Sequence, residues 1–130
     1  MPFVRISLRK DQSLETKNAI SESIHKSLIS QFHIPLDDYI QVIEELEQYQ
    51  IKYPKSYLGI PHTDDIVFIQ ITAGAGRTAE QKSLLYTEIA QRISSATTIK
   101  PDDIIIILVE NNGSENWSFG QGKQFTTQIL

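Results

Sequence analysis

A proline follows the first methionine in the stretch MPFVRISL, and its nitrogen could do chemistry. If Met1 is removed after translation, Pro2 carries a chain-terminal amine, a group that titrates at about 7.7–8.0. The neutral amine would act as a general base or nucleophile, and the cation as a general acid. A proline is also acceptable as the first residue of a strand, where no ladder donor is needed. The Met-Pro dipeptide taken alone favours this structural role.

Two charged residues lie in segments that could face a small acid. In GAGRTAEQ (74–81) glycines lead into a helix start, where free N–H groups favour an anion, and Arg77 adds a fork donor suited to a carboxylate. The alternative is a glycine-rich turn with a solvated arginine. Asp38 ends the turn IPLDD, and its alternative is a purely structural role in that turn.

Aromatic residues follow in the tail segment NWSFGQG. An extended chain would place Trp117 and Phe119 on one side, with a turn at Gly120 and Gly122, and the structural interpretation of this pair is a hydrophobic anchor for the tail. The three histidines, at positions 25, 33 and 62, are not spaced as metal ligands, and the absence of cysteine excludes thiolate sites and disulfides. We expect no metal and no cofactor.

The composition indicates one soluble domain spanning residues 1–130. Hydrophobic residues make up 40% and charged residues 22%, and the net charge of −4 argues against nucleic-acid or anionic-membrane partners. The longest apolar run, Ile104 to Val109, is too short to span a bilayer, and no signal peptide is evident. A cytoplasmic protein is the expectation.

The sequence contains an internal repeat. Shifted by 65 positions, residues 2–45 align with the second half without a gap and with eleven identities. The identical pairs are Phe3/Phe68, Ile6/Ile71, Glu15/Glu80, Lys17/Lys82, Ile24/Ile89, Ser30/Ser95, Ile34/Ile99, Asp37/Asp102, Asp38/Asp103, Ile40/Ile105 and Glu45/Glu110. The copies differ where chemistry is possible, because Val67 stands opposite Pro2 and Gln12 opposite Arg77.

Each half (about 2–46 and 66–111, before a tail of 112–130) reads strand, helix, strand. The first half predicts strands at 2–8 and 39–46 around a helix at 13–31. The second predicts strands at 65–72 and 104–111 around a helix that begins at the capping box of Thr78 and Gln81. The last strand is apolar on both faces and is therefore expected inside a sheet. Parallel βαβ units in tandem predict an α+β (α/β) fold: one four-stranded sheet with both helices on one face. The uncovered face, with Phe3 and several Ile and Val, predicts an obligate oligomer.

These features resemble the tautomerase superfamily, and within it the malonate semialdehyde decarboxylase group. The resemblance runs from MPFVRISL through WSFGQG and is strongest at RTAEQK (77–82), IKPDDIIIILVEN (99–111) and NWSFGQGKQF (116–125). It implies a homotrimer with a pocket around Pro2. It further implies that Pro2 is the catalytic amine, Asp38 tunes it or orients a water, Arg77 holds the substrate carboxylate, and Trp117 and Phe119 wall the pocket.

The chain departs from the decarboxylase pattern in two places: Ala75 stands where that pattern has a second arginine, and Tyr39 where it has another arginine. The leading hypothesis is therefore an enzyme that uses Pro2 for keto–enol tautomerisation of a small 2-oxo acid. The alternatives are a decarboxylase or hydratase acting on related acids, with cationic Pro2 as the acid, and a non-catalytic trimer that only binds a ligand.

Overall fold

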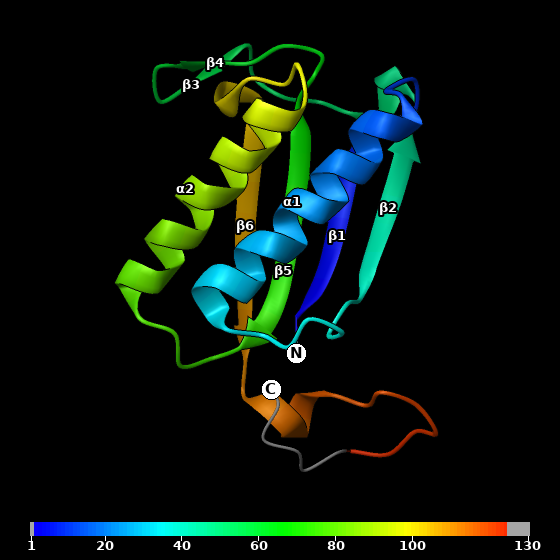
Figure 1. Ribbon diagram of the computed structural model, residues 1–130. Helices are drawn as coiled ribbons and strands as arrows, with labels where there is room; N and C mark the ends of the chain where they lie inside the picture. The colour runs from blue at the N-terminus through cyan, green and yellow to red at the C-terminus, as the bar shows by residue number, and fades with distance from the viewer. Residues whose placement is uncertain (1, 125–130) are drawn as a thin grey trace.

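A computed structural model describes residues 2–124. Four strands form a sheet in the order β2-β1-β5-β6, and two helices cover one face of it (Figure 1). The elements of this layer pair are β1 (Phe3–Arg9), α1 (Leu14–Phe32), β2 (Gln41–Leu46), β5 (Val67–Gly74), α2 (Ala79–Ala96) and β6 (Ile104–Asn111). The predicted fold class is thus confirmed, with element boundaries within about two residues of those expected.

The two halves join through an antiparallel strand pair. Within each half the strands are parallel, β1 with β2 and β5 with β6. Between the halves β1 runs antiparallel to β5, with Phe3 opposite Thr72 and Ser7 opposite Phe68. The first residue of β1 therefore lies beside the last residues of β5.

Local sequence signals explain where the helices begin and end. Ser13 caps α1 by accepting a hydrogen bond from the Thr16 N–H at 3.0 Å. Thr78 and Gln81 form the predicted capping box at the start of α2. His33 ends α1 in the left-handed conformation, at a φ of 56°, two residues before Pro35.

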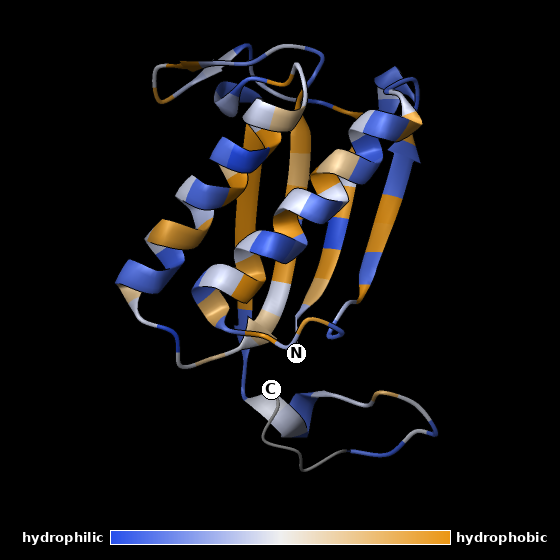
Figure 2. Cartoon of the chain, in the orientation of Figure 1, coloured by the Kyte–Doolittle hydropathy of each residue, from blue (hydrophilic) through white to orange (hydrophobic). Residues whose placement is uncertain are grey.

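The core lies between the sheet and the helices. Alternate residues of the central strands face the helices, and the helices return one apolar stripe each. Figure 2 shows strands that are largely orange behind helices whose outward turns are largely blue. The fully buried members include Val4, Ile6, Leu8, Ile20, Ile24, Leu28, Ile69, Ile71, Leu85, Ile89 and Ile93.

The opposite face of the sheet is open and less apolar than expected. On its β1–β2 side Glu44 accepts hydrogen bonds from Arg5 at 3.1 Å and from Ser7 at 2.7 Å. Exposed apolar residues lie on both edge strands: Ile107 (51% exposed) and Val109 (40%) on β6, and Val42 (40%) on β2. The oligomer inferred from this face stays a prediction.

The expectation that strand 104–111 is internal is wrong for the single chain, because β6 is an edge strand. Its two apolar faces have different surroundings. Ile104, Ile106 and Leu108 pack against the core, whereas Ile107 and Val109 remain exposed on the open face. A strand can therefore be apolar on both faces because one face packs on the core and the other lies on the open side of the sheet. It does not need a neighbouring strand on each side.

The linker between the halves closes the end of the sheet away from the N-terminus (Figure 1). It contains a short hairpin of β3 (Ser56–Tyr57) and β4 (Ile60–Pro61), joined by Leu58 and Gly59, both at positive φ. Two adjacent positive φ angles are typical of the tightest hairpin turns. Across residues 2–124, neither helix combines the length and hydrophobicity that a membrane span requires.

The repeat also preserves one ion pair between helix and strand. Lys17 on α1 bonds Glu45 on β2, and the equivalent Lys82 on α2 bonds Glu110 on β6. The two pairs differ in their surroundings. The Lys17 side chain is 7% exposed and also donates to the Lys10 carbonyl at 2.8 Å, whereas the Lys82 side chain is 27% exposed.

We expect the Lys17→Ala variant to lower the free energy of unfolding by about 2 kcal/mol, because it removes a buried stem and leaves the Lys10 carbonyl without its donor. The matched Lys82→Ala variant should cost about 0–1 kcal/mol, as a more exposed pair does. Urea denaturation of both variants at neutral pH measures the difference. Equal losses in the two variants would contradict this account.

Candidate active site

The topology gathers six chain segments at one end of the sheet. Because β1 and β5 are antiparallel, the start of β1 lies beside the end of β5, and Pro2 directly precedes Phe3, which pairs with Thr72. The end of α1 and the start of α2 meet here too, since Gln81 donates to the Gln31 carbonyl at 3.2 Å. Figure 1 shows the N-terminus, both helix ends, the start of β2 and the end of β6 at this end.

Asp38 sits in the loop that joins α1 to β2 at the same end. Its backbone N–H closes a turn on the Pro35 carbonyl at 3.1 Å, and the Ile40 carbonyl then accepts the Val4 N–H at 3.1 Å, two residues from Pro2. Pro2 is itself buried. The loop therefore brings Asp38 to the start of β1, as the proposed site requires.

The Asp38 carboxyl group is buried and makes no hydrogen bond to the described residues. The residue is 5% exposed, and neither carboxyl oxygen has a hydrogen-bond partner within residues 2–124. Burial raises the pKa of the Asp38 carboxyl group above its usual value and the neighbouring charge of Asp37 adds to the rise, whereas the charge of His25 opposes it. Buried carboxylates are normally paired or hydrogen-bonded, and residues 2–124 supply no hydrogen-bond partner for this one.

The repeat supplies an internal comparison for Asp38. Its counterpart Asp103 makes the same backbone turn, with its N–H on the Lys100 carbonyl at 2.9 Å. The Asp103 carboxylate, however, is satisfied: it accepts from the Thr63 N–H at 2.7 Å and from the Thr63 hydroxyl at 2.5 Å. The structural turn role therefore describes the carboxylate of Asp103 and not that of Asp38.

Arg77 is held at the start of α2. Its Nη1 donates to the Gly74 carbonyl at 3.0 Å, and its guanidinium lies 4.7 Å from the centroid of the Phe32 ring. Partial burial lowers the pKa of the Arg77 guanidinium, while the charge of Glu110 opposes that shift. Arginine stays protonated in this setting. The side chain is thus a positioned cation, unlike the solvated arginine of the alternative interpretation.

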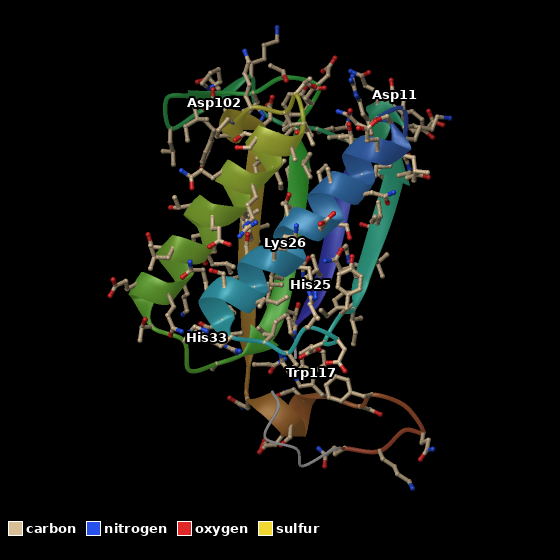
Figure 3. The ribbon with its side chains drawn as sticks, viewed as in Figure 1. Asp11, His25, Lys26, His33, Asp102 and Trp117 are labelled. Carbon is tan, nitrogen blue, oxygen red and sulfur yellow. The ribbon has the colours of Figure 1, made fainter. Side chains whose placement is uncertain are left out.

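Trp117 and Phe119 form an aromatic wall beyond the end of β6. Their rings stack with centroids 5.2 Å apart and an interplanar angle of 18°. The predicted turn is present, since Gly120 and Gly122 have positive φ and Ser118 bridges to Gln124. The 3₁₀ turn Gly113–Asn116 that precedes Trp117 contacts β5, and Figure 3 shows Trp117 at the end of the sheet opposite Asp102.

The structure thus brings to one end of the sheet the segments that carry all five candidate residues: Pro2, Asp38, Arg77, Trp117 and Phe119. Met1, on which the state of the Pro2 nitrogen depends, and Phe125, the last residue of the NWSFGQGKQF motif, lie outside the described residues. The catalytic and binding roles of the five residues stay predictions.

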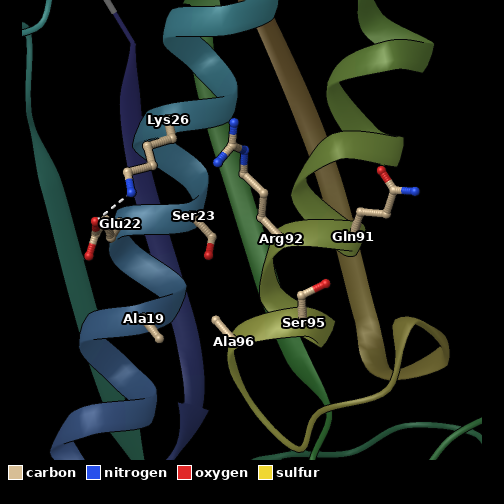
Figure 4. A pocket seen from close by; sticks show the side chains of 8 residues that line it. All are labelled: Ala19, Glu22, Ser23, Lys26, Gln91, Arg92, Ser95 and Ala96. Atoms are coloured by element: carbon tan, nitrogen blue, oxygen red, sulfur yellow. Dashed lines mark ion pairs between the residues drawn. The ribbon is translucent and has the colours of Figure 1, made fainter.

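Two hollows on the chain lie elsewhere. One, of about 480 Å³, is an open groove between α1 and α2 (Figure 4), where Lys26 pairs with Glu22 and Arg92 projects from α2. Another, of about 350 Å³, lies under the β3–β4 hairpin and beside the start of β6. Neither is lined by any candidate residue, so size alone does not locate the site in an isolated chain.

Known proteins resemble the chain over nearly its whole length. Sequence models described as "Tautomerase enzyme" match residues 38–120 and residues 2–52. The probable tautomerase YusQ of Bacillus subtilis (strain 168) is 41% identical over 123 residues, which cover 95% of this chain and 96% of that protein. The chain belongs to the tautomerase family. A second probable tautomerase of this bacterium, YrdN, is 28% identical over the full length of both chains.

Solved structures place this tautomerase-family chain in the malonate semialdehyde decarboxylase-like group. The structure of FG41 malonate semialdehyde decarboxylase inhibited by 3-bromopropiolate matches with a TM-score of 0.85 and 29% identity, covering 93% of this chain and 91% of that one. A fused 4-OT described as a symmetric trimer matches with a TM-score of 0.74 over 94% of both chains, at 14% identity, and so shares the fold.

Sequence reasoning missed two residues that support the site. The Phe32 ring makes a cation–π contact with the Arg77 guanidinium. Asn111 accepts a hydrogen bond from the Trp117 indole at 3.1 Å. Both depart from the repeat, because Thr97 stands opposite Phe32 and Leu46 opposite Asn111. The comparison of halves that singled out Pro2 and Arg77 would have found them too.

Replacing Asp38 or Asp103 by asparagine should have different effects on stability. We expect Asp103→Asn to lower the free energy of unfolding by about 2 kcal/mol, because it weakens two hydrogen bonds to a charged acceptor. Asp38→Asn should leave it unchanged or raise it, since it removes an unpartnered buried charge. Urea denaturation of the pair near pH 7 tests this. Equal destabilisation by both changes would show that Asp38 is structural as well.

The stability advantage of the Asp38→Asn variant should depend on pH. Because the pKa of Asp38 is raised in the folded chain, the folded state binds more protons than the unfolded state above about pH 4. The free energy of unfolding of the wild type should therefore fall relative to the variant as pH rises through the folded-state pKa. A series of denaturation curves between pH 4 and pH 8 measures the difference, and a constant difference would contradict the raised pKa.

Proposed function

We propose that the protein is an enzyme that uses the amine of Pro2, exposed by removal of Met1, to move a proton on a small 2-oxo acid. The observation that carries the proposal is Asp38: a buried carboxyl group with no hydrogen-bond partner within residues 2–124, in the loop that pairs with the start of β1. An amine at Pro2 would supply the missing partner, and a carboxylate beside it would raise the pKa of that amine.

The remaining residues suit a carboxylate substrate. Arg77 would bind the carboxylate as a fork donor, and Trp117 with Phe119 would shield the reacting carbons from water. Ketonisation of an enol moves one proton from the enol oxygen to the neighbouring carbon, so it needs only a proton carrier and a cation near the developing enolate. The inhibition of a structurally similar decarboxylase by 3-bromopropiolate, itself a small acid, supports this class of substrate.

A homotrimer is proposed as the working form. The exposed apolar residues of β6 need cover, and the uncovered sheet face offers a surface for identical chains to share. The similar fused 4-OT is described as a symmetric trimer, which supports the same arrangement here. Neighbouring chains would then also cover the end of the sheet at which Pro2 and Asp38 lie. Neither of the two described hollows is at that end.

The direct test is the ketonisation of phenylenolpyruvate, followed by the loss of enol absorbance. Pro2→Ala and a preparation that retains Met1 should both lose turnover, because each removes the secondary amine. Intact-mass measurement establishes which terminus each preparation carries. A rate that rises across the Pro2 pKa would assign the amine as a general base, and a rate that falls there would assign it as a general acid. Full activity in either altered protein would refute the mechanism.

Decarboxylation of a 3-oxo acid is a second candidate, favoured by the 29% identity and near-complete coverage of malonate semialdehyde decarboxylase. Ala75 stands where the decarboxylase pattern has a second arginine, and losing one charge-assisted contact costs about 1.5–3 kcal/mol. We therefore expect little carbon dioxide release from malonate semialdehyde by the wild type and about tenfold or more release by Ala75→Arg. Rapid release by the wild type would make decarboxylation the leading function.

The non-enzymatic alternative is a trimer that only binds its ligand. It would be favoured if intact-mass analysis showed Met1 on the protein isolated from its own cells, because the Pro2 nitrogen would then be an amide without basicity.

A further inference from the structure

Asn111, the last residue of β6, joins the two parts of the candidate site through separate groups. Its backbone carbonyl accepts the Ala75 N–H at 2.8 Å, at the start of the loop that carries Arg77. Its side-chain Oδ1 accepts the Trp117 indole N–H at 3.1 Å and the Gly113 N–H at 3.0 Å. One residue therefore contacts both the cation-bearing loop and the aromatic wall.

The side-chain contacts of Asn111 fix the direction of the tail. The strand ends at this residue, and the chain then turns at Gly113, at a φ of 76°, into the 3₁₀ turn that ends before Trp117. An amide oxygen has two lone pairs, and here the Gly113 and Trp117 donors occupy both. The first bond shapes the turn and the second sets the position of the indole, which in turn stacks on Phe119.

Comparison of the two halves indicates that the strand does not require asparagine at position 111. Leu46 occupies the equivalent last position of β2, where the chain continues into a 3₁₀ turn of the linker instead of an aromatic wall. An asparagine at position 111 is thus compatible with the strand but specific to the tail that follows it.

We propose that Asn111 is a positioning residue that sets Trp117 against the Arg77 loop, and so determines how tightly the site holds its acid substrate. Asn111 is not assigned a direct contact with the substrate. The kinetic part of this inference rests on the proposed function, whereas the placement of Trp117 does not. Because the chain has a single tryptophan, its fluorescence reports on this residue alone.

The test compares the emission of Trp117 with steady-state kinetics on phenylenolpyruvate. In Asn111→Ala the indole loses its acceptor, so we expect a shifted emission maximum and a KM raised about tenfold with a much smaller change in kcat. Asn111→Asp keeps an acceptor oxygen and should restore the wild-type emission. The matched control is Asn112→Ala, at an exposed neighbour whose backbone N–H bonds Asn116; it should match the wild type in both measurements.

Asn111→Leu, which copies the residue at the equivalent position of β2, replaces the alanine variant if that protein does not fold. Wild-type emission and KM in the alanine or leucine variant would overturn the inference. If the wild type does not turn over phenylenolpyruvate, the proposed function fails, and emission alone decides the inference. A shift in Asn111→Ala that Asn111→Asp reverses then supports the placement of Trp117, and an unshifted spectrum refutes it.

Discussion

The antiparallel pairing of β1 with β5 is the contact on which the rest of the structure depends. Each half of the repeat makes only a two-stranded parallel sheet under one helix, too small to bury its own core. Joining the halves through their first strands closes the core between both helices. The same pairing sets the start of β1 against the end of β5, and so brings Pro2 to the edge where the Arg77 loop leaves the sheet.

The repeat places equivalent helix-to-strand turns at opposite ends of the sheet, and the side-chain contacts of these two turns differ. At one end Asp103 is tied to Thr63 of the linker, and Arg9 and Gln12 both bond Asp65. Each charged side chain named there has a partner for at least one of its polar atoms, although the buried Arg9 Nε makes no hydrogen bond within residues 2–124. At the other end the equivalent turn leaves the Asp38 carboxyl group buried and unsatisfied within residues 2–124. Equivalent turns with different side-chain partners point to a functional constraint at the second end.

The elements themselves were predictable because their signals are local. Alternating residues indicated the strands, and i, i+4 stripes with the capping box of Thr78 and Gln81 indicated the helices. The prediction failed for β6, which is an edge strand, because an apolar run does not distinguish a strand partner from a contact across the open face. Likewise, the Glu44 network with Arg5 on that face depends on register between β1 and β2, which periodicity does not specify.

By itself the sequence determined the duplication, the βαβ order of each half and the asymmetric positions Pro2 and Arg77, because these follow from residue types and spacing. Only the tertiary structure decided that Asp38 is buried without a partner while its repeat Asp103 is satisfied, and that Asn111 contacts both the Arg77 loop and Trp117. Burial and hydrogen bonding are properties of surroundings built from distant parts of the chain. Two aspartates at equivalent positions of the repeat can therefore differ in chemistry.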